Sequence, residues 1–130
     1  MTLYDSSVLI EYLDGDDDVV SYVESHLDER AVAPPLALFE VYQGEIFKNG
    51  PTNLSAVDGA LEWVTTVETA GETARAAGEL QDELRDQGQP LAARDAFIAG
   101  AAIAHDEPLV VADADFDVAA LTDLLEVTFL

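Results

Sequence analysis

The sequence predicts an α/β protein, a three-layer α/β/α sandwich around a central parallel sheet of about four or five short strands. Short apolar runs bounded by turn residues alternate along it with longer segments of helical periodicity. The chain has 130 residues, of which 49% are hydrophobic. This is enough for one well-buried core and too little for two ordinary domains. We therefore expect a single domain over residues 1–130.

The charge balance is extreme, with 27 Asp and Glu residues against five Lys and Arg and a formal net charge of -22. A disordered acidic tail would concentrate the acids and lack apolar residues, whereas here the acids are spread among Val, Leu, Ala and Phe. The pattern favours a folded domain with an acidic surface, as salt-adapted (halophilic) organisms use.

The sequence lacks the residues that several kinds of site and segment require. There is no cysteine, so disulfides, thiol nucleophiles and zinc–thiolate sites are excluded. No stretch approaches the ~20 apolar residues of a membrane helix, and the first residues lack the basic and apolar regions of a secretory signal. We expect a cytoplasmic protein with no membrane partner.

A short strand over residues 1–4 opens the chain, and a short helix follows through residue 13. Asp5 lies at the junction, where a helix N-cap is an equally good interpretation of the local sequence. An acidic turn over residues 14–18 leads to a helix that we expect to close near Arg30. Its apolar face would consist of Val19, Val20, Val23 and Leu27.

A second short strand, residues 31–33, is stopped by two prolines, the second of which suits the first turn of a helix. Glu40 lies in the early turns of this helix, so its carboxylate could point back towards the strand ends. The spacing predicts that Phe39, Tyr42 and Ile46 form the buried face.

Asn49-Gly50-Pro51 breaks the chain, and two capping boxes are then predicted. Ser55 with Asp58 would open a helix through Trp63, and Thr69 with Glu72 would open a longer helix that ends at Gly88. Residues 64–67 between them are predicted to form a third strand. The buried face of the longer helix would consist of Ala70, Ala74, Ala77, Leu80 and Leu84.

The stretch from Leu91 to Asp117 combines a helix, a turn, a buried strand and several carboxylates. Asp95 stands at the head of an Ala-rich helix, which Pro108 forces the chain to leave. The strand over residues 109–111 then delivers Asp113 and Asp115 to its carboxyl end, where open α/β sheets place their sites. A short helix over residues 118–124 and an edge strand over residues 126–130 complete the chain.

Four acids are thus expected at or near one edge of the sheet: Asp5, Glu40, Asp95 and Asp113. Four converging carboxylates would repel one another strongly unless a cation were present, so convergence implies a divalent metal. Oxygen-only ligation, with no cysteine and no convincing histidine, favours Mg²⁺ or Mn²⁺ over zinc.

Three known motifs with clustered acids do not fit. The run from Asp113 begins like an EF-hand loop, but Val118 and Leu124 occupy the positions that need glycine and a bidentate glutamate. A phosphatase with an aspartyl nucleophile needs a second Asp two residues after the first, whereas Asp5 is followed by two serines. A receiver domain needs a lysine beyond a late strand, and the only lysine is Lys48.

Four segments, in this order and spacing, carry a resemblance to a known family: LYDSSVLIEYL, PLALFEVYQGE, GQPLAARDAFIAGAAIAHD and LVVADADFD. With them the chain resembles a PIN-domain ribonuclease over nearly its whole length. In size and layout it resembles the VapC-type toxins of toxin–antitoxin pairs. The resemblance therefore implies a PIN-like fold.

The resemblance also assigns roles. It implies that Asp5, Glu40, Asp95 and Asp113 are the catalytic, metal-binding quartet. Asp115 is then an auxiliary acid, and Ser6 or Ser7 orients Asp5 or a metal-bound water.

The sequence departs from the family at two places. Val111 stands where the family often has a threonine, which removes a possible hydroxyl beside the site. Basic residues that would grip RNA are few, and Arg94, beside Asp95, is the best candidate for a phosphate contact. An ion pair between Arg94 and a neighbouring carboxylate is an equally good interpretation.

The function implied is Mg²⁺- or Mn²⁺-dependent hydrolysis of RNA phosphodiester bonds, with one metal ion or two. The resemblance further implies a toxin role, controlled by a small antitoxin protein that occludes the site. A homodimer is expected, because family members usually pair and because Phe39, Tyr42 and Phe47 offer apolar surface. The alternatives are a non-catalytic PIN-like module that binds RNA or a protein, and a metal-dependent phosphatase or DNA nuclease.

The acidic surface predicts that the fold needs molar salt. Charges of one sign repel across a Debye length of ~30 Å at 0.01 M salt, but of only ~3 Å at 1 M. Circular-dichroism melts should therefore give a higher Tm in concentrated KCl than in dilute buffer. Equal melting temperatures would remove the argument for salt adaptation.

Overall fold

The computed structural model describes residues 1–130 and contains one sheet of five parallel strands. The strand order is β3-β2-β1-β4-β5, and each neighbouring pair is parallel. The predicted parallel sheet is confirmed, as is the C-terminal strand at its edge. The strands are β1 (Thr2–Tyr4), β2 (Ala31–Ala33), β3 (Val64–Thr66), β4 (Leu109–Val111) and β5 (Val127–Phe129).

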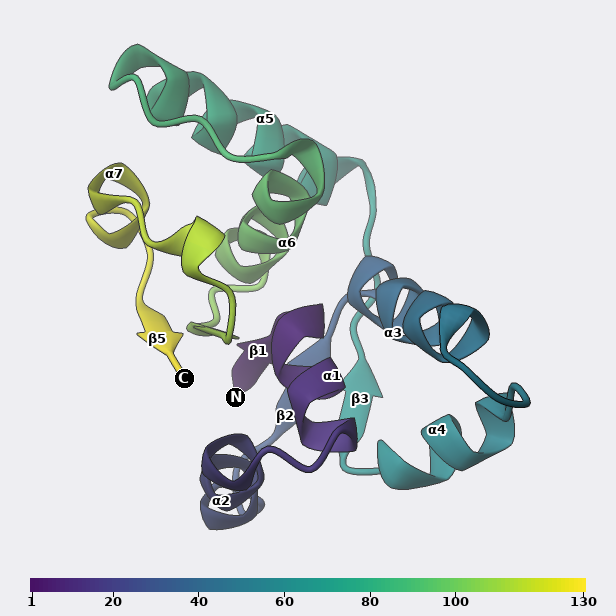
Figure 1. Ribbon diagram of the computed structural model, residues 1–130. Helices are drawn as coiled ribbons and strands as arrows, with labels where there is room; N and C mark the ends of the chain where they lie inside the picture. The colour runs from purple at the N-terminus through teal and green to yellow at the C-terminus, as the bar shows by residue number, and fades with distance from the viewer.

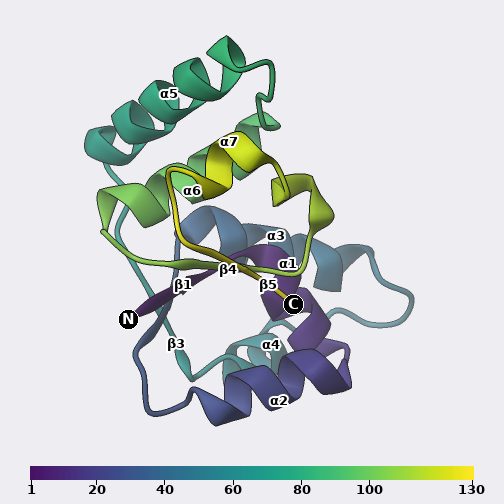
Figure 2. The ribbon, with the colours of Figure 1, turned by 90° about the vertical axis from the view of Figure 1, so that its left-hand side faces the viewer.

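Helices cover both sides of this sheet, which confirms the three layers. Figure 2 shows α5, α6 and α7 on one side of the strands and α2 and α4 on the other, while α1 packs against α2 and α3. The helices are α1 (Ser6–Leu13), α2 (Asp17–Ser25), α3 (Pro35–Phe47), α4 (Leu54–Ala60), α5 (Gly71–Asp86), α6 (Ala93–Ala104) and α7 (Ala119–Thr122), with a 3₁₀ turn η1 (Ala114–Phe116) before α7.

The three central strands are buried throughout, whereas the edge strands β3 and β5 are partly exposed. A parallel strand covered by helices on both faces has no polar side, which explains why the central strands appear in the sequence as continuous apolar runs. No helix of the chain has both the length and the apolar character needed to cross a membrane.

The helices α5 and α6 pack closely against each other, because small residues face each other where they cross. A methyl group added at Gly100 of α6 would lie 2.6 Å from both Cα and Cβ of Ala77 in α5. Only glycine allows this approach. Gly100 thus permits a close helix contact that helps to bring α6 and its first turn into position.

Two predicted helix starts are wrong, because backbone contacts outside the local motif decide where these helices begin. The side chain of Asn53 caps α4 by accepting from the Ala56 N–H (3.0 Å), two residues before the predicted cap at Ser55. The Asn53 backbone N–H is itself held by Glu45 of α3 (3.3 Å). The helix also ends at Ala60, before Trp63.

Thr69 does not cap α5, which begins at Gly71 with no side-chain cap. The residues before it stay extended, since the Val67 N–H donates to the β2 carbonyl of Ala33 (3.0 Å). The ring of His105 also bonds the carbonyl of Glu68 (2.9 Å). These two contacts hold the segment after β3 against its neighbours, so α5 begins only at Gly71.

The predicted buried face of α3 is wrong as well. The side chains that face the core are Ala37 and Val41, whereas Phe39 is 55% exposed and Ile46 48% exposed. Tyr42 is half-buried and donates to Asp58 (2.5 Å). Apolar residues occur all round this helix, so their spacing could not indicate which face the core selects.

The helix α2 ends at Ser25 and leaves Leu27 56% exposed, whereas a longer helix with Leu27 buried was predicted. The side chains of Ser25 (2.8 Å) and His26 (2.7 Å) both bond the carbonyl of Tyr22. Side-chain bonds of this kind compete with the next helical turn and end it.

The contact between α5 and α6 predicts opposite effects for two Gly→Ala substitutions. Gly100→Ala should destabilise the fold by about 1–3 kcal/mol through overpacking against Ala77. Gly78→Ala, in α5 with open space around it, should stabilise by up to about 1 kcal/mol, because alanine favours helix. Denaturant unfolding of both variants measures this, and equal midpoints would contradict the close contact.

Candidate functional site

The candidate site lies where the connections of the sheet change direction. From β1 the chain moves outwards to β2 and then β3, and it later returns to the other side of β1 to form β4 and β5. Ligand sites in open α/β sheets occur at such a switch point, beyond the carboxyl ends of the strands. Asp5 directly follows β1, and Asp113 follows β4 after one residue. Figure 1 shows β1 and α1 near the centre of the fold, and β4 pairs with β1.

Asp5 is the most buried acid of the site, with 2% of its surface exposed. Its Oδ2 accepts from the backbone N–H of Ser7 (3.0 Å) and from the Ser7 hydroxyl, so Asp5 caps α1 as its local sequence allowed. Its Oδ1 is buried and has no hydrogen-bond partner. Burial is the main cause that raises the pKa of this carboxyl, Ser7 lowers it, and the charge of Asp113 raises it.

Ser7 fixes the geometry between the two central strands. Its hydroxyl oxygen accepts from the backbone N–H of Ala112 (2.9 Å), the residue between β4 and Asp113. The same hydroxyl donates to Asp5. One side chain therefore ties the two carboxylate-bearing strand ends together, while the neighbouring Ser6 is buried at the start of α1.

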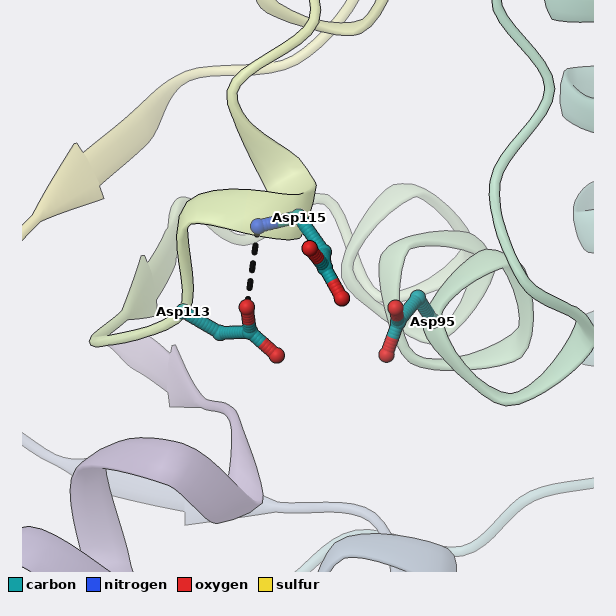
Figure 3. Close-up of side chains that lie close together, drawn as sticks. All are labelled: Asp95, Asp113 and Asp115. Atoms are coloured by element: carbon teal, nitrogen blue, oxygen red, sulfur yellow. Dashed lines mark hydrogen bonds between the residues drawn. The ribbon is translucent and has the colours of Figure 1, made fainter.

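Asp113 and Asp115 belong to one tight turn. The Asp113 Oδ1 accepts from the Asp115 N–H (2.9 Å) and caps the 3₁₀ turn η1, which the fully buried Phe116 anchors. Across from them, Asp95 lies in the first turn of α6. Figure 3 shows the three carboxylates facing a common space from these two elements. One oxygen of each lies within 4.8 Å of those of the other two.

The pKa of Asp95 shows the repulsion among these carboxylates. Burial is the largest cause that raises its pKa to about 6, and the charges of Asp5, Asp113, Asp115 and Glu40 raise it further. All five predicted acids therefore lie close enough for their charges to interact at this one residue. The N-cap of α6 is Ala92, so Asp95 lies inside the first turn and does not cap the helix.

Glu40 projects from α3 but is not part of the closest group of acids. Its Oε2 forms an ion pair with Nη1 of Arg94 on α6 (3.0 Å). Burial raises the pKa of Glu40, the Arg94 guanidinium lowers it, and the charge of Asp5 raises it. Of the two interpretations of Arg94, the ion pair with a neighbouring carboxylate is the one that the structure contains.

The fold thus brings the predicted acids together. The three that lie closest to one another are not all members of the predicted quartet. Asp115, predicted as auxiliary, lies in the closest group, whereas Glu40 is held by Arg94. The catalytic roles of Asp5, Glu40, Asp95 and Asp113 remain predictions.

Two glutamines that support the site were missed. Gln81 of α5 clamps the backbone of Leu91 in both directions, with its amide donating to the Leu91 carbonyl (2.5 Å) and its oxygen accepting from the Leu91 N–H (2.9 Å). The Gln89 side chain accepts from the Ala120 N–H of α7 (2.9 Å). These three bonds hold the segment that enters α6 and so position Asp95. Only long-range contacts reveal this role, since exposed glutamines on helices and in turns are common.

The donor set fits a divalent cation. A buried carboxylate oxygen without a partner, as in Asp5, is costly unless a positive charge or a donor satisfies it. The neighbouring carboxylates would add repulsion unless a cation offset it. The possible ligands gathered here are carboxylate oxygens and the Ser7 hydroxyl, and oxygen ligands suit Mg²⁺ and Mn²⁺.

A sequence profile for one family, described as PIN domain, matches residues 2–121. The chain belongs to the PIN-domain family. No curated protein matches the sequence significantly. The PIN fold of the chain is similar to several solved structures at low sequence identity, so these likenesses concern the fold alone.

Three of these structures cover nearly the whole chain. VapBC2 from Rickettsia felis bound to a promoter DNA fragment has a TM-score of 0.83 and 18% identity over 99% of this chain and 98% of that one. DNA-bound VapBC from Salmonella typhimurium has a TM-score of 0.81 and 18% identity over 99% and 98%. FitAcB from Neisseria gonorrhoeae has a TM-score of 0.78 and 19% identity over 100% and 97%.

The raised pKa of Asp95 predicts how the stability of the metal-free protein depends on pH. Unfolded, this carboxyl loses its proton near its ordinary value of 3.8, whereas folded it keeps the proton up to about pH 6. Between these values the folded state binds more protons, so the free energy of unfolding should fall as pH rises from 4 to 6. Melts in EDTA across this range measure the fall.

Asp95→Asn is the matched control, because asparagine has nearly the same shape and no charge. The variant should lose less stability over the same pH range and melt at or above the wild-type temperature at pH 7. If the melting temperatures of wild type and variant depended on pH in the same way, the neighbouring acids would not be raising the pKa of Asp95.

Proposed function

We propose that this PIN domain is a Mg²⁺- or Mn²⁺-dependent endoribonuclease and the toxin of a toxin–antitoxin pair. The observation that carries the proposal is the convergence of carboxylates at the switch point of a PIN-family sheet, next to Asp5, whose buried Oδ1 has no partner. Such a constellation suits phosphodiester chemistry, in which positioning and charge neutralisation matter more than a reactive side chain.

In this proposal the cation is held by Asp5, Asp95 and Asp113, with Asp115 and Glu40 beside them. When bound, the ion would lower the pKa of a water molecule and offset the charge of the substrate phosphate. The chain's own residues supply the geometry. Asp5 is held by the Ser7 hydroxyl and backbone, and Asp113 by the turn that it caps, so neither carboxylate has to be ordered on binding.

The small number of Lys and Arg side chains supports a mode of substrate binding in which the metal ion makes the main phosphate contact. Nucleic-acid-binding proteins usually neutralise phosphates with free Lys and Arg. Here four of the five basic side chains are already in ion pairs, which are Lys48 with Glu45, Arg75 with Glu79, Arg85 with Asp82 and Arg94 with Glu40. Phosphate contacts in this protein would therefore concentrate at the carboxylate cluster and its cation.

Apolar surface supports the proposal of protein partners. The similar structures include, by their descriptions, VapBC and toxin–antitoxin complexes. A hollow of about 470 Å³ lies between α1, α3 and α4 and gives an antitoxin a surface to cover. Its apolar lining consists of Ile10, Leu13, Val41, Ala56 and Val57.

Phe39 and the 81%-exposed Phe47 lie on α3 and support pairing with a second copy. Light scattering in concentrated KCl measures the mass of the particle. A particle of monomer mass at high protein concentration would contradict the homodimer.

Asp95→Asn should reduce Mg²⁺-dependent RNA cleavage about a hundredfold or more, because even residues that only support metal ligands typically contribute 10–100-fold. Glu40→Gln should also reduce it. Asp123→Asn, an exposed acid outside the cluster, is the matched control and should cleave as wild type does. Cleavage is measured on RNA in competition with DNA and a phosphomonoester under Mn²⁺. Undiminished cleavage by Asp95→Asn and Glu40→Gln would exclude this site as the nuclease centre.

The partner proposal predicts the effect of filling the hollow. Gly44 of α3 lines it, and nothing lies within 4 Å of a Cβ added there, so Gly44→Arg should obstruct the surface without disturbing the fold. Co-purification with the product of the neighbouring reading frame should be lost. Gly78→Arg, equally unobstructed but on α5, should retain it. Retention by both variants would place the partner elsewhere.

A further inference from the structure

The ion pair between Arg94 and Glu40 differs from the other side-chain ion pairs of the chain. The pairs of Lys48, Arg75 and Arg85 join residues of the same helix or its end, within five residues in the sequence. The pair of Arg94 instead joins α6 to α3 across the candidate site. It is also unequal in exposure, since the Glu40 side chain is 17% exposed and that of Arg94 65% exposed. The guanidinium therefore lies on the solvent side of a largely covered carboxylate.

The position of Arg94 in its helix does not explain its presence. It is the second residue of α6, in the first turn, where the helix dipole favours negative charge and disfavours a cation. The stabilising contribution of Arg94 must come from elsewhere. The nearest partner is Glu40, and the next residue, Asp95, belongs to the closest group of acids.

A cation at this place offsets part of the repulsion among the carboxylates. Without Arg94, Glu40 would be a largely covered negative charge with no partner, and it would repel both Asp5 and Asp95. A guanidinium is always charged and needs no external ion. A divalent ion bound to the cluster would supply the same compensation and would attract the same carboxylate.

We propose that Arg94 is an internal counter-ion that holds Glu40 in the metal-free protein and competes with a divalent cation for that carboxylate. This inference rests on the proposed function, because it takes the carboxylate cluster to be the cation site. It makes Arg94 a positioning residue that sets the affinity for the metal. Once the cation binds, the exposed guanidinium is free to contact a substrate phosphate.

The competition is tested by titrating the metal-free protein with MgCl₂ in a calorimeter at one KCl concentration. Arg94→Gln should bind Mg²⁺ about fivefold more tightly, which is the effect of losing one ion pair at the upper end of the exposed range. In EDTA the same variant should melt below wild type, because Glu40 has lost its compensation. Arg94→Lys keeps the charge and should remain close to wild type in both measurements.

Two controls separate competition for Glu40 from a general change of charge. Arg75→Gln makes the same change of net charge on α5 and should leave the Mg²⁺ affinity unchanged. In a Glu40→Gln background, Arg94→Gln should have little further effect, because the carboxylate under competition is gone.

Unchanged or weaker Mg²⁺ binding by Arg94→Gln would overturn the inference, as would an equal gain from Arg75→Gln or in the Glu40→Gln background. A wild-type protein that takes up no Mg²⁺ would overturn both this inference and the metal site. RNA does not enter the titration. A chain that shows the competition but cleaves no RNA would therefore retain the inference and lose the proposed function.

Discussion

Repulsion between carboxylates held at one edge of a parallel sheet is the constraint on which the rest of this structure depends. Asp5, Asp95, Asp113 and Asp115 come from three separate parts of the chain, and their charges act together on the pKa of Asp95. Like charges at such distances separate unless the backbone holds them. In the absence of a cation, contacts of the backbone and of neighbouring side chains therefore have to hold these carboxylates together.

Several contacts supply it, and each acts on the backbone that carries an acid. Ser7 connects the end of β1 with the residue after β4. Gln81 clamps the segment before α6, and the glycine at position 100 lets α6 approach α5 closely. None of these groups is a carboxylate of the cluster, yet each fixes the position of one. Contacts of this kind around a group of possible metal ligands fix the orientation of the ligands.

The acidity of the whole molecule adds to the local constraint. With a net charge of -22, the surface opposes the approach of an RNA backbone as well as the compaction of the fold. Four of the five basic residues are engaged in ion pairs, and three of these pairs are local to one helix. The exception, Arg94, lies at the carboxylate cluster. Charge compensation in this protein is thus concentrated where the acids are densest.

The sequence by itself determined the parallel α/β architecture and the gathering of the acids, because both follow from local patterns. Apolar runs such as residues 109–111 predict buried parallel strands, and an acid directly after such a strand must lie at its carboxyl end. Asp5 and Asp113 could be placed in this way. Asp95 could be placed at the start of its helix.

Only the tertiary structure decided which partners these residues have. Phe39 is exposed because the core selects the small residues Ala37 and Val41 on a helix that is apolar all round. Asp115 rather than Glu40 joins the closest group of acids, because Arg94 of another helix holds Glu40. Such choices depend on distances between segments far apart in the chain, and local spacing carries no information about those distances.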